Sequence, residues 1–139
     1  MVRVLLAVAH SSLRATLEEC LVQGGEMSCG TAATSEELWS RLSHDEWDVL
    51  VLDLRLPEQT KRATVHTLHA RYPDLPILVL SLSRAVPFGR WQEAGARGFL
   101  AKAKLSTELI EAVRVISRGG KYFREEEGQQ EGEGGERIP

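Results

Sequence analysis

Long hydrophobic runs are missing from this chain of 139 residues, and cysteine is scarce. The apolar run that begins at Val2 is too short to cross a membrane, and it lacks the charged region and long apolar stretch of a signal peptide. The two cysteines, Cys20 and Cys29, have no metal-ligand spacing. We therefore expect a cytoplasmic protein with no membrane contact, in which both cysteines are small core residues in a reducing compartment.

A strong charge of one sign is also lacking over most of the chain. The formal net charge is −3, and residues 124–139 hold six acids and two bases, so residues 1–123 carry one net positive charge. The net charge of residues 1–123 is close to zero and does not by itself indicate nucleic-acid binding. Residues 1–123 are the expected domain. Residues 124–139, rich in Glu, Gln and Gly, are expected to form a flexible acidic linker or tail.

Phosphate-binding loops and catalytic pairs are not evident in the sequence. Gly24-Gly25 and Gly119-Gly120 follow expected helices, so we interpret them as helix ends rather than as nucleotide-binding loops. No nucleophile–base pair indicates catalysis. His10 and Asp53 could both bind a metal, but two ligands do not make a site. We therefore expect neither an enzyme nor a metalloprotein, and a small flavodoxin-like enzyme or nucleotide binder is the least favoured alternative.

The chain does have short apolar segments that alternate with helical patterns. Strands are expected at 2–7, 27–32, 49–52, 77–80 and 99–101, and helices at about 12–23, 35–44, 61–71, 88–94 and 106–117. This alternation predicts an α/β fold of five βα units, with a doubly wound parallel five-stranded sheet.

Several local signals refine these helices. Ser11 or Ser12 can cap the first helix, and Thr34 with Glu37 forms a capping box at the start of the second. Trp39, Trp47 and Trp91 are expected to pack in the core or at its edge, and Trp91, in the expected helix at 88–94, is the best candidate among them for an exposed contact.

Polar side chains follow three of the expected strands. Asp53 follows the strand at 49–52, Ser81 follows the strand at 77–80, and Lys102 follows the strand at 99–101. Ligands and chemistry gather at the carboxyl ends of the strands in open parallel sheets. An Asp placed there can accept a phosphoryl group, a hydroxyl can hydrogen-bond that group, and a Lys can neutralise it.

In this arrangement the chain resembles the receiver domain of bacterial two-component response regulators, and in particular receivers of the NarL/LuxR type. The resemblance implies a CheY-like fold and phosphorelay signalling. It aligns Asp53 with the phospho-acceptor, Ser81 with the switch hydroxyl, Lys102 with the invariant lysine and Phe99 with the switch aromatic. It covers residues 2–123 through five segments in order, namely 2–7, 48–57, 71–81, 93–102 and 119–123.

The sequence departs from the family pattern at Val8 and Ala9. Receivers normally carry two acidic residues at these positions, and these acids hold a magnesium ion together with the acceptor Asp. Mg²⁺ binds through oxygen ligands, so we expect magnesium binding to be weak or lost and no cofactor to be needed. We therefore interpret the chain as a degenerate receiver, or pseudo-receiver, in which Asp53 forms a standing ion pair with Lys102.

The favoured function is an atypical receiver domain that acts by protein–protein contact, through the expected elements at 88–94, 99–101 and 106–117. The resemblance implies regulation of transcription, with a protein partner or the chain's own DNA-binding effector domain, and a possible homodimer. It implies no direct nucleic-acid contact by this segment. The alternative is a functional phospho-receiver that accepts a phosphoryl group from a histidine kinase at Asp53.

Overall fold

The structure, a computed structural model, describes residues 1–55, 61–81 and 89–123, so the expected tail at 124–139 lies outside the described residues. The strands are β1 (Val2–Ala7), β2 (Met27–Ala32), β3 (Val49–Asp53), β4 (Ile77–Ser81), β5 (Gly98–Ala101) and β6 (Tyr122–Phe123). The helices are α1 (Ser11–Gln23), α2 (Ser35–His44), α3 (Lys61–Arg71), α4 (Gly89–Ala94) and α5 (Leu105–Ser117), and the short 3₁₀ helix η1 (Lys102–Lys104) precedes α5.

The strands form one parallel sheet in the order β2-β1-β3-β4-β5-β6. The predicted α/β class and parallel topology are confirmed, and the sheet has a sixth strand beyond the five that were predicted. The additional strand, β6, pairs with β5 through Gly98 opposite Tyr122 and Phe99 opposite Phe123. The hydroxyl of Tyr122 also donates to Oε1 of Glu108 on α5, at 2.5 Å. A strand of two residues is defined by these distant partners, so it leaves no local sequence pattern.

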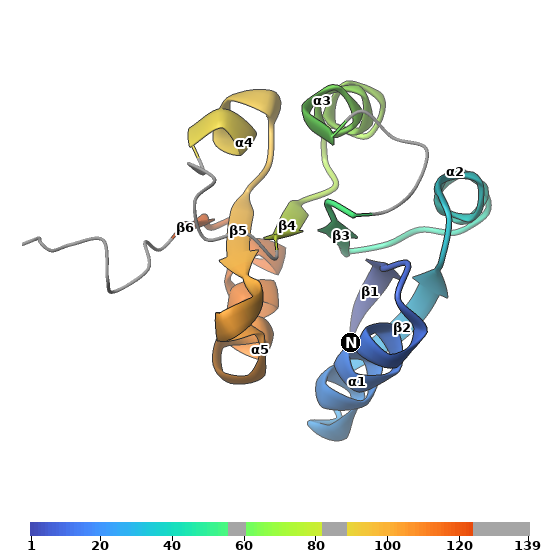
Figure 1. Ribbon diagram of the computed structural model, residues 1–139, viewed down its shortest axis with the longest axis vertical. Coiled ribbons are helices and arrows are strands. Elements are labelled where there is room, and N and C mark those ends of the chain that lie inside the picture. The colour runs from blue at the N-terminus through green and yellow to red at the C-terminus, as the bar shows by residue number, and fades with distance from the viewer. Residues whose placement is uncertain (56–60, 82–88, 124–139) are drawn as a thin grey trace, which may run out of the picture.

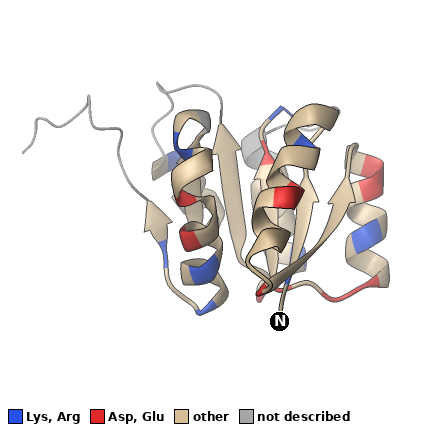
Figure 2. Cartoon of the chain, turned by 90° about the horizontal axis from the view of Figure 1, so that it is seen from below, with Lys and Arg blue, Asp and Glu red and all other residues tan. Residues whose placement is uncertain are grey.

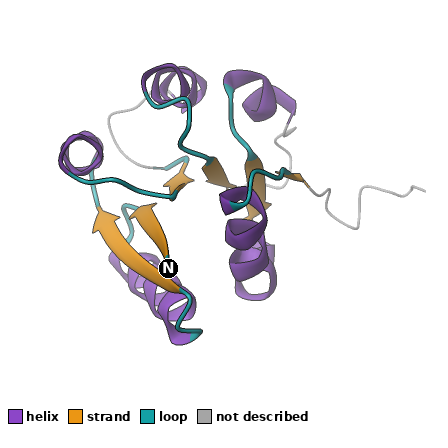
Figure 3. Cartoon of the chain, turned by 180° about the vertical axis from the view of Figure 1, so that it is seen from behind, coloured by secondary structure: helices purple, strands orange, loops and turns teal. Residues whose placement is uncertain are grey.

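Helices cover both faces of the sheet, with α1 and α5 on one face and α2, α3 and α4 on the other (Figure 1). The view from behind in Figure 3 shows the same two layers. The central strand β3 is buried along its whole length, which explains why its sequence is continuously apolar up to Asp53. Its residues alternate between the two hydrophobic clusters, with Leu50 and Leu52 in one and Val49 and Val51 in the other.

The helix ends agree with the sequence signals in one case and differ in another. Thr34 caps α2 by accepting a hydrogen bond from the backbone N–H of Glu37 at 3.1 Å, as predicted, and the Glu37 carboxylate accepts from the N–H of Ala33 at 2.7 Å. The expected cap of α1 is wrong, because Ser11 is already helical and the N-cap is His10. Its Nδ1 accepts from the N–H of Leu13 at 3.4 Å.

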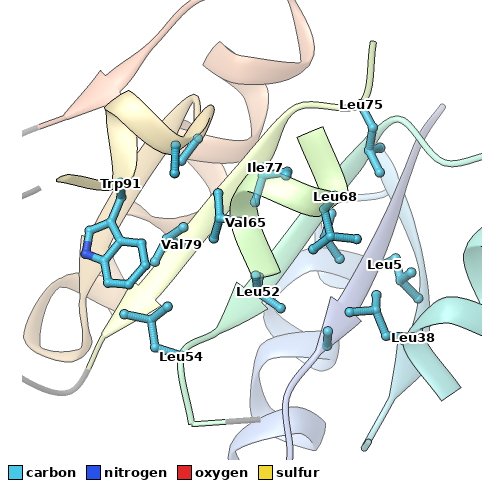
Figure 4. Close-up of a cluster of buried hydrophobic side chains, with 14 of the residues drawn as sticks. Leu5, Leu38, Leu52, Leu54, Val65, Leu68, Leu75, Ile77, Val79 and Trp91 are labelled. Carbon is cyan, nitrogen blue, oxygen red and sulfur yellow. The ribbon is translucent and has the colours of Figure 1, made fainter. Parts of the chain in front are cut away.

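Two expectations about burial are also wrong. Trp91 is only 4% exposed, and it belongs to the hydrophobic cluster that contains Leu54 and Val79 (Figure 4). It therefore offers no exposed contact, because its indole is directed from α4 into this cluster. Cys20 and Cys29 are half-buried rather than core residues. None of the helices in the described ranges is long and apolar enough to cross a membrane.

Candidate functional site

The register of the sheet brings two of the predicted polar residues to neighbouring strand ends. Asp53, the last residue of β3, lies opposite Leu80, and Ser81 follows immediately at the end of β4. The N–H of Leu54 continues the pairing by donating to the carbonyl of Leu80 at 3.1 Å. Asp53 and Ser81 are each 5% exposed, and they are the buried polar residues among those that the structure describes.

The Asp53 carboxylate takes part in the turn that leaves β3. Its Oδ1 accepts a hydrogen bond from the backbone N–H of Arg55 at 2.9 Å, the pattern of an Asx turn. A cavity of about 200 Å³ lies beside this turn and is lined by Ala9, His10, Asp53 and Arg55. His10 and Asp53, the two possible metal ligands considered from the sequence, thus line one cavity.

Val8 and Ala9 continue the hydrophobic core to this edge of the sheet. Val8 is fully buried in the cluster under α1 and α5, and its N–H donates to the carbonyl of Ala32 at 3.0 Å. Ala9 packs against the opposite cluster. The positions where the resembled family carries acids therefore hold apolar side chains that pack inward on both faces.

Sequence reasoning missed Arg14, which closes the loop between β1 and α1. Its Nη1 donates to the carbonyl oxygens of Val8 at 2.9 Å and of Ala9 at 3.2 Å. The guanidinium therefore donates a hydrogen bond to each of the two carbonyl oxygens. The available signal was weak, because an Arg in the first turns of a helix is usually a solvated residue.

The described residues at this edge offer few of the ligands that a magnesium ion requires. Mg²⁺ requires oxygen ligands in near-octahedral geometry, usually including one or two carboxylates. Asp53 is the one carboxylate among the described residues that line the cavity, and the Nδ1 of His10 already caps α1. Among the residues that the structure describes, no group of three His, Cys, Asp or Glu side chains could hold a metal.

The two remaining site residues are Phe99, which lies in β5, and Lys102, which directly follows it. Phe99 is 6% exposed and belongs to the cluster under α2, α3 and α4, so it is a core residue at this position. Lys102 begins η1 directly after β5, as predicted, but its side chain lies outside the described part of the structure. The ion pair between Lys102 and Asp53 stays a prediction.

Comparison with known proteins gives a consistent family assignment. Residues 4–114 match the family profile described as the response regulator receiver domain. The response regulator GacA of Pseudomonas viridiflava is 26% identical over 132 residues, which cover 94% of this chain and 62% of that protein. The response regulator UvrY of Escherichia coli K12 is 28% identical over 137 residues, covering 94% of this chain and 61% of that protein. The chain thus spans about six-tenths of the length of these relatives.

Solved structures show the same fold. The isolated REC domain of RcsB from Salmonella enterica serovar Typhimurium, determined with the phosphomimetic BeF₃⁻, has a TM-score of 0.81 at 22% identity, covering 89% of this chain and 94% of that chain. The signal receiver domain of NarL from Mycobacterium tuberculosis has a TM-score of 0.77 at 24% identity, covering 85% of this chain and 97% of that chain. At these identities the likeness establishes the fold alone.

Proposed function

The chain belongs to the response regulator receiver domain family, and we propose that it is a degenerate receiver that signals by protein contact rather than by phosphorylation at Asp53. On this proposal it is a non-enzymatic, cytoplasmic module that needs no cofactor. It retains the receiver scaffold and has lost the metal-dependent chemistry.

The burial of Val8 is the observation that carries this proposal. Phosphoryl transfer to a carboxylate depends on a metal that spreads the charge of the transferring group. A carboxylate at position 8 would face that metal in the resembled family, but here a fully buried valine packs into the core. With Ala9 beside it, Asp53 is the single carboxylate that the described residues offer to the cavity at this edge. The barrier to its phosphorylation is therefore expected to be several kcal/mol higher, on the general scale of such effects.

Asp53 then has a structural role. Its carboxylate holds the Asx turn to Arg55, and a charge pair with Lys102 would fix the strand end in one conformation. Signalling would depend on the surface formed by α4, β5 and α5, which changes with the protein partner rather than with phosphorylation. The relatives named above are longer, so a DNA-binding effector domain of the same polypeptide is one such partner, and a second receiver in a homodimer is another.

The transcription-regulator context can be tested from the gene. If the reading frame continues beyond Pro139 into a helix-turn-helix pattern, the domain belongs to a transcription regulator. A stop codon at that point would contradict this part of the proposal, while the contact function of the receiver itself would remain to be measured.

A phosphorylatable receiver is the second candidate function, and one observation favours it. Asp53 and Ser81 are kept at adjacent strand ends, both nearly buried, in the positions that resemble the acceptor and the switch hydroxyl. A histidine kinase would on this account transfer a phosphoryl group from its phosphohistidine to an Asp53 oxygen, with loss of the bond to the histidine nitrogen.

The two functions are separated by incubating the protein with acetyl phosphate and Mg²⁺ and measuring its intact mass. The degenerate receiver should show no phosphoryl adduct. Beryllofluoride with Mg²⁺ should leave its amide NMR spectrum unchanged. An adduct that disappears in Asp53→Asn would overturn the proposal in favour of the phospho-receiver. A receiver of known activity, treated in parallel, serves as the positive control.

A further inference from the structure

The last strand directs the chain toward the edge of the sheet that holds Asp53. Strand β6 runs parallel to β5, and its last residue, Phe123, lies opposite Phe99. The register continues through Val79 on β4 to Leu52 on β3, the residue before Asp53. The chain therefore passes Phe123 in the direction of the edge where β3, β4 and β5 end, here called the carboxyl edge.

The direction of β6 is fixed by its contacts with neighbouring elements. The N–H of Tyr122 donates to the carbonyl of Arg97 at 2.9 Å, and its hydroxyl donates to Glu108 on α5 at 2.5 Å. A Cβ added at Gly98 would lie 3.2 Å from the carbonyl oxygen of Tyr122, so the two strands approach closely at this glycine. A segment attached to β6 thus starts from a defined position, which lowers the ordering cost of binding nearby.

The two edges of the sheet differ in charge. The connections from strands to helices, which lie at the carboxyl edge, hold four bases and one acid, in residues 8–10, 33–34, 54–60, 82–88 and 102–104. The connections from helices to strands, at the opposite edge, hold five acids and three bases, in residues 24–26, 45–48, 72–76, 95–97 and 118–121. Figure 2, in which the arrowheads point to the carboxyl edge, shows Lys and Arg at several places along it. An acidic segment is therefore attracted to the carboxyl edge.

Three basic residues of the described part lie at this edge close to β6. Arg55 follows β3, Arg90 lies in the first turn of α4, and Lys104 ends η1 after β5. Arg55 and Arg90 are exposed, and Lys104 is half-buried. Their side chains have no ion-pair partner among the residues that the structure describes. The acids Glu36 and Glu37 begin α2 beside β2, at the far end of the sheet from β6.

The residues after β6 have the charge and the length to reach these bases. Residues 124–139 hold six acids and two bases, a net charge of −4. Strand β3 is the third strand from β6, about 15 Å away at the usual strand spacing. An extended residue covers about 3.3 Å, so about five residues span this distance. The acids at 125–127 are thus within reach of β4 and β5, and Glu131 and Glu133 are within reach of β3.

We propose that the acidic segment 124–139 binds back onto the carboxyl edge of its own chain, with its carboxylates against Arg55, Arg90 and Lys104. The segment then supplies a permanent anion at the edge where the resembled family carries a phosphoryl group. This role as a fixed anion rests on the proposed degenerate receiver, whereas the contact itself does not. An acidic partner of the receiver would have to displace the segment from this edge.

The test uses the full chain with a nitroxide attached through Gln129→Cys, after Cys20→Ser and Cys29→Ser have removed the native thiols. At low ionic strength we expect strong broadening of the amide signals of residues 55, 90 and 104, and little at residues 36 and 37. Raising the salt to about 1 M shortens the screening length to about 3 Å and should remove the broadening. Equal broadening at residues 36 and 55, or broadening that salt does not change, would overturn the proposal.

Charge variants test the contact in the chain with its native cysteines. Glu125→Gln/Glu126→Gln/Glu127→Gln should shift the amide signals of residues 55, 90 and 104. The control Glu19→Gln/Asp45→Asn/Glu46→Gln removes the same charge from exposed positions elsewhere and should leave these signals in place. Equal shifts in the two triple variants, or none in the first, would contradict the proposal.

A mixed sample identifies the occupant of the edge. Nitroxide-labelled chain without ¹⁵N, added to ¹⁵N-labelled chain without nitroxide, should cause no broadening at residues 55, 90 and 104. Broadening in this mixture would assign the contact to a second copy and overturn the binding within one chain. These measurements use neither Mg²⁺ nor a phosphodonor, so their failure is distinct from a failure of the degenerate-receiver function.

Discussion

The backbone N–H of Arg55 donates a hydrogen bond to Oδ1 of Asp53 at 2.9 Å. This bond joins the end of β3 to the turn that follows it, and it requires an acceptor oxygen on the side chain at position 53. The aspartate thus has a use in the fold that does not depend on phosphorylation. Its retention is therefore consistent with the proposed degenerate receiver.

The turn bond predicts a difference between two substitutions of Asp53. Asp53→Asn keeps an acceptor oxygen, whereas Asp53→Ala removes it and leaves the N–H of Arg55 without its partner. We expect the Ala variant to have a free energy of unfolding about 1 kcal/mol lower than that of the Asn variant, the size of one net hydrogen bond. Urea denaturation of both variants measures this difference. Equal stabilities would show that the turn bond contributes nothing.

Burial of Val8 predicts that an acid at this position is costly. Val8→Asp places a carboxylate among apolar side chains, and we expect a loss of about 3 kcal/mol or more in the free energy of unfolding. Val8→Ala, which only shortens the side chain, should lose about 2 kcal/mol.

The same variant has a predicted pH dependence. A carboxyl group buried without a partner has a folded-state pKa above its unfolded value, so the destabilisation should shrink as the pH falls and the group becomes neutral. A Val8→Asp protein as stable as Val8→Ala at neutral pH would contradict the account of this position.

The capping contacts predict opposite results for two hydroxyl residues. Thr34→Ala removes the acceptor for the N–H of Glu37 and should cost about 1 kcal/mol. Ser12→Ala should be close to neutral, because Ser12 is exposed and His10 caps α1. Thermal or urea unfolding of the two variants tests the comparison. A larger loss of stability for Ser12→Ala than for Thr34→Ala would indicate that Ser12 caps α1, as the sequence alone suggested.

These contacts also show which features of the fold could be predicted from the sequence and which could not. The end of α3 could be predicted from a local signal, since Pro73 cannot continue a helix. Strand β3 could be predicted from its continuous apolar run. The cap of α1 does not follow, because His10 competes with two serines that local propensity favours. Its role depends on the extended backbone at His10, with φ −76° and ψ 118°, which places the imidazole over the first turn of the helix.

The remaining differences arise from packing between distant segments. Trp91 is buried because α4 packs beside α3 and over β4, which a six-residue helix with one large apolar side chain does not reveal. The bond from Arg14 to the carbonyls of Val8 and Ala9 likewise depends on the fold of the loop. At the candidate site, the placement of Asp53 and Ser81 at the ends of their strands was predictable from the sequence. The hydrogen bond between Asp53 and the N–H of Arg55 was not.

The environment of Cys29 predicts a loss of stability at alkaline pH. Burial, with the nearby Glu18 carboxylate, raises the pKa of the Cys29 thiol from 9.0 to about 11. Between these values the unfolded chain releases the thiol proton while the folded chain keeps it, so the free energy of unfolding should fall as the pH rises from about 9 to 11. Below pH 9 the thiol is protonated in both states and contributes no pH dependence.

The contribution of this thiol is isolated by comparing the wild type with Cys29→Ala, because lysines and tyrosines titrate in the same range. Urea unfolding at several pH values should show a steeper alkaline loss in the wild type. Parallel curves for the two proteins would show that Cys29 titrates alike in the folded and unfolded states.

The central claim, that the receiver scaffold has lost its metal-dependent chemistry, is tested most directly by titrating Mg²⁺ while following the amide resonances of Val8, Asp53 and Arg55. The double variant Val8→Asp/Ala9→Asp, if folded, serves as a control in which the acidic pair is restored. We predict no saturable shift in the wild type at millimolar Mg²⁺ and a saturable shift in the control. Saturable millimolar or tighter binding at these three residues of the wild type would contradict the claim.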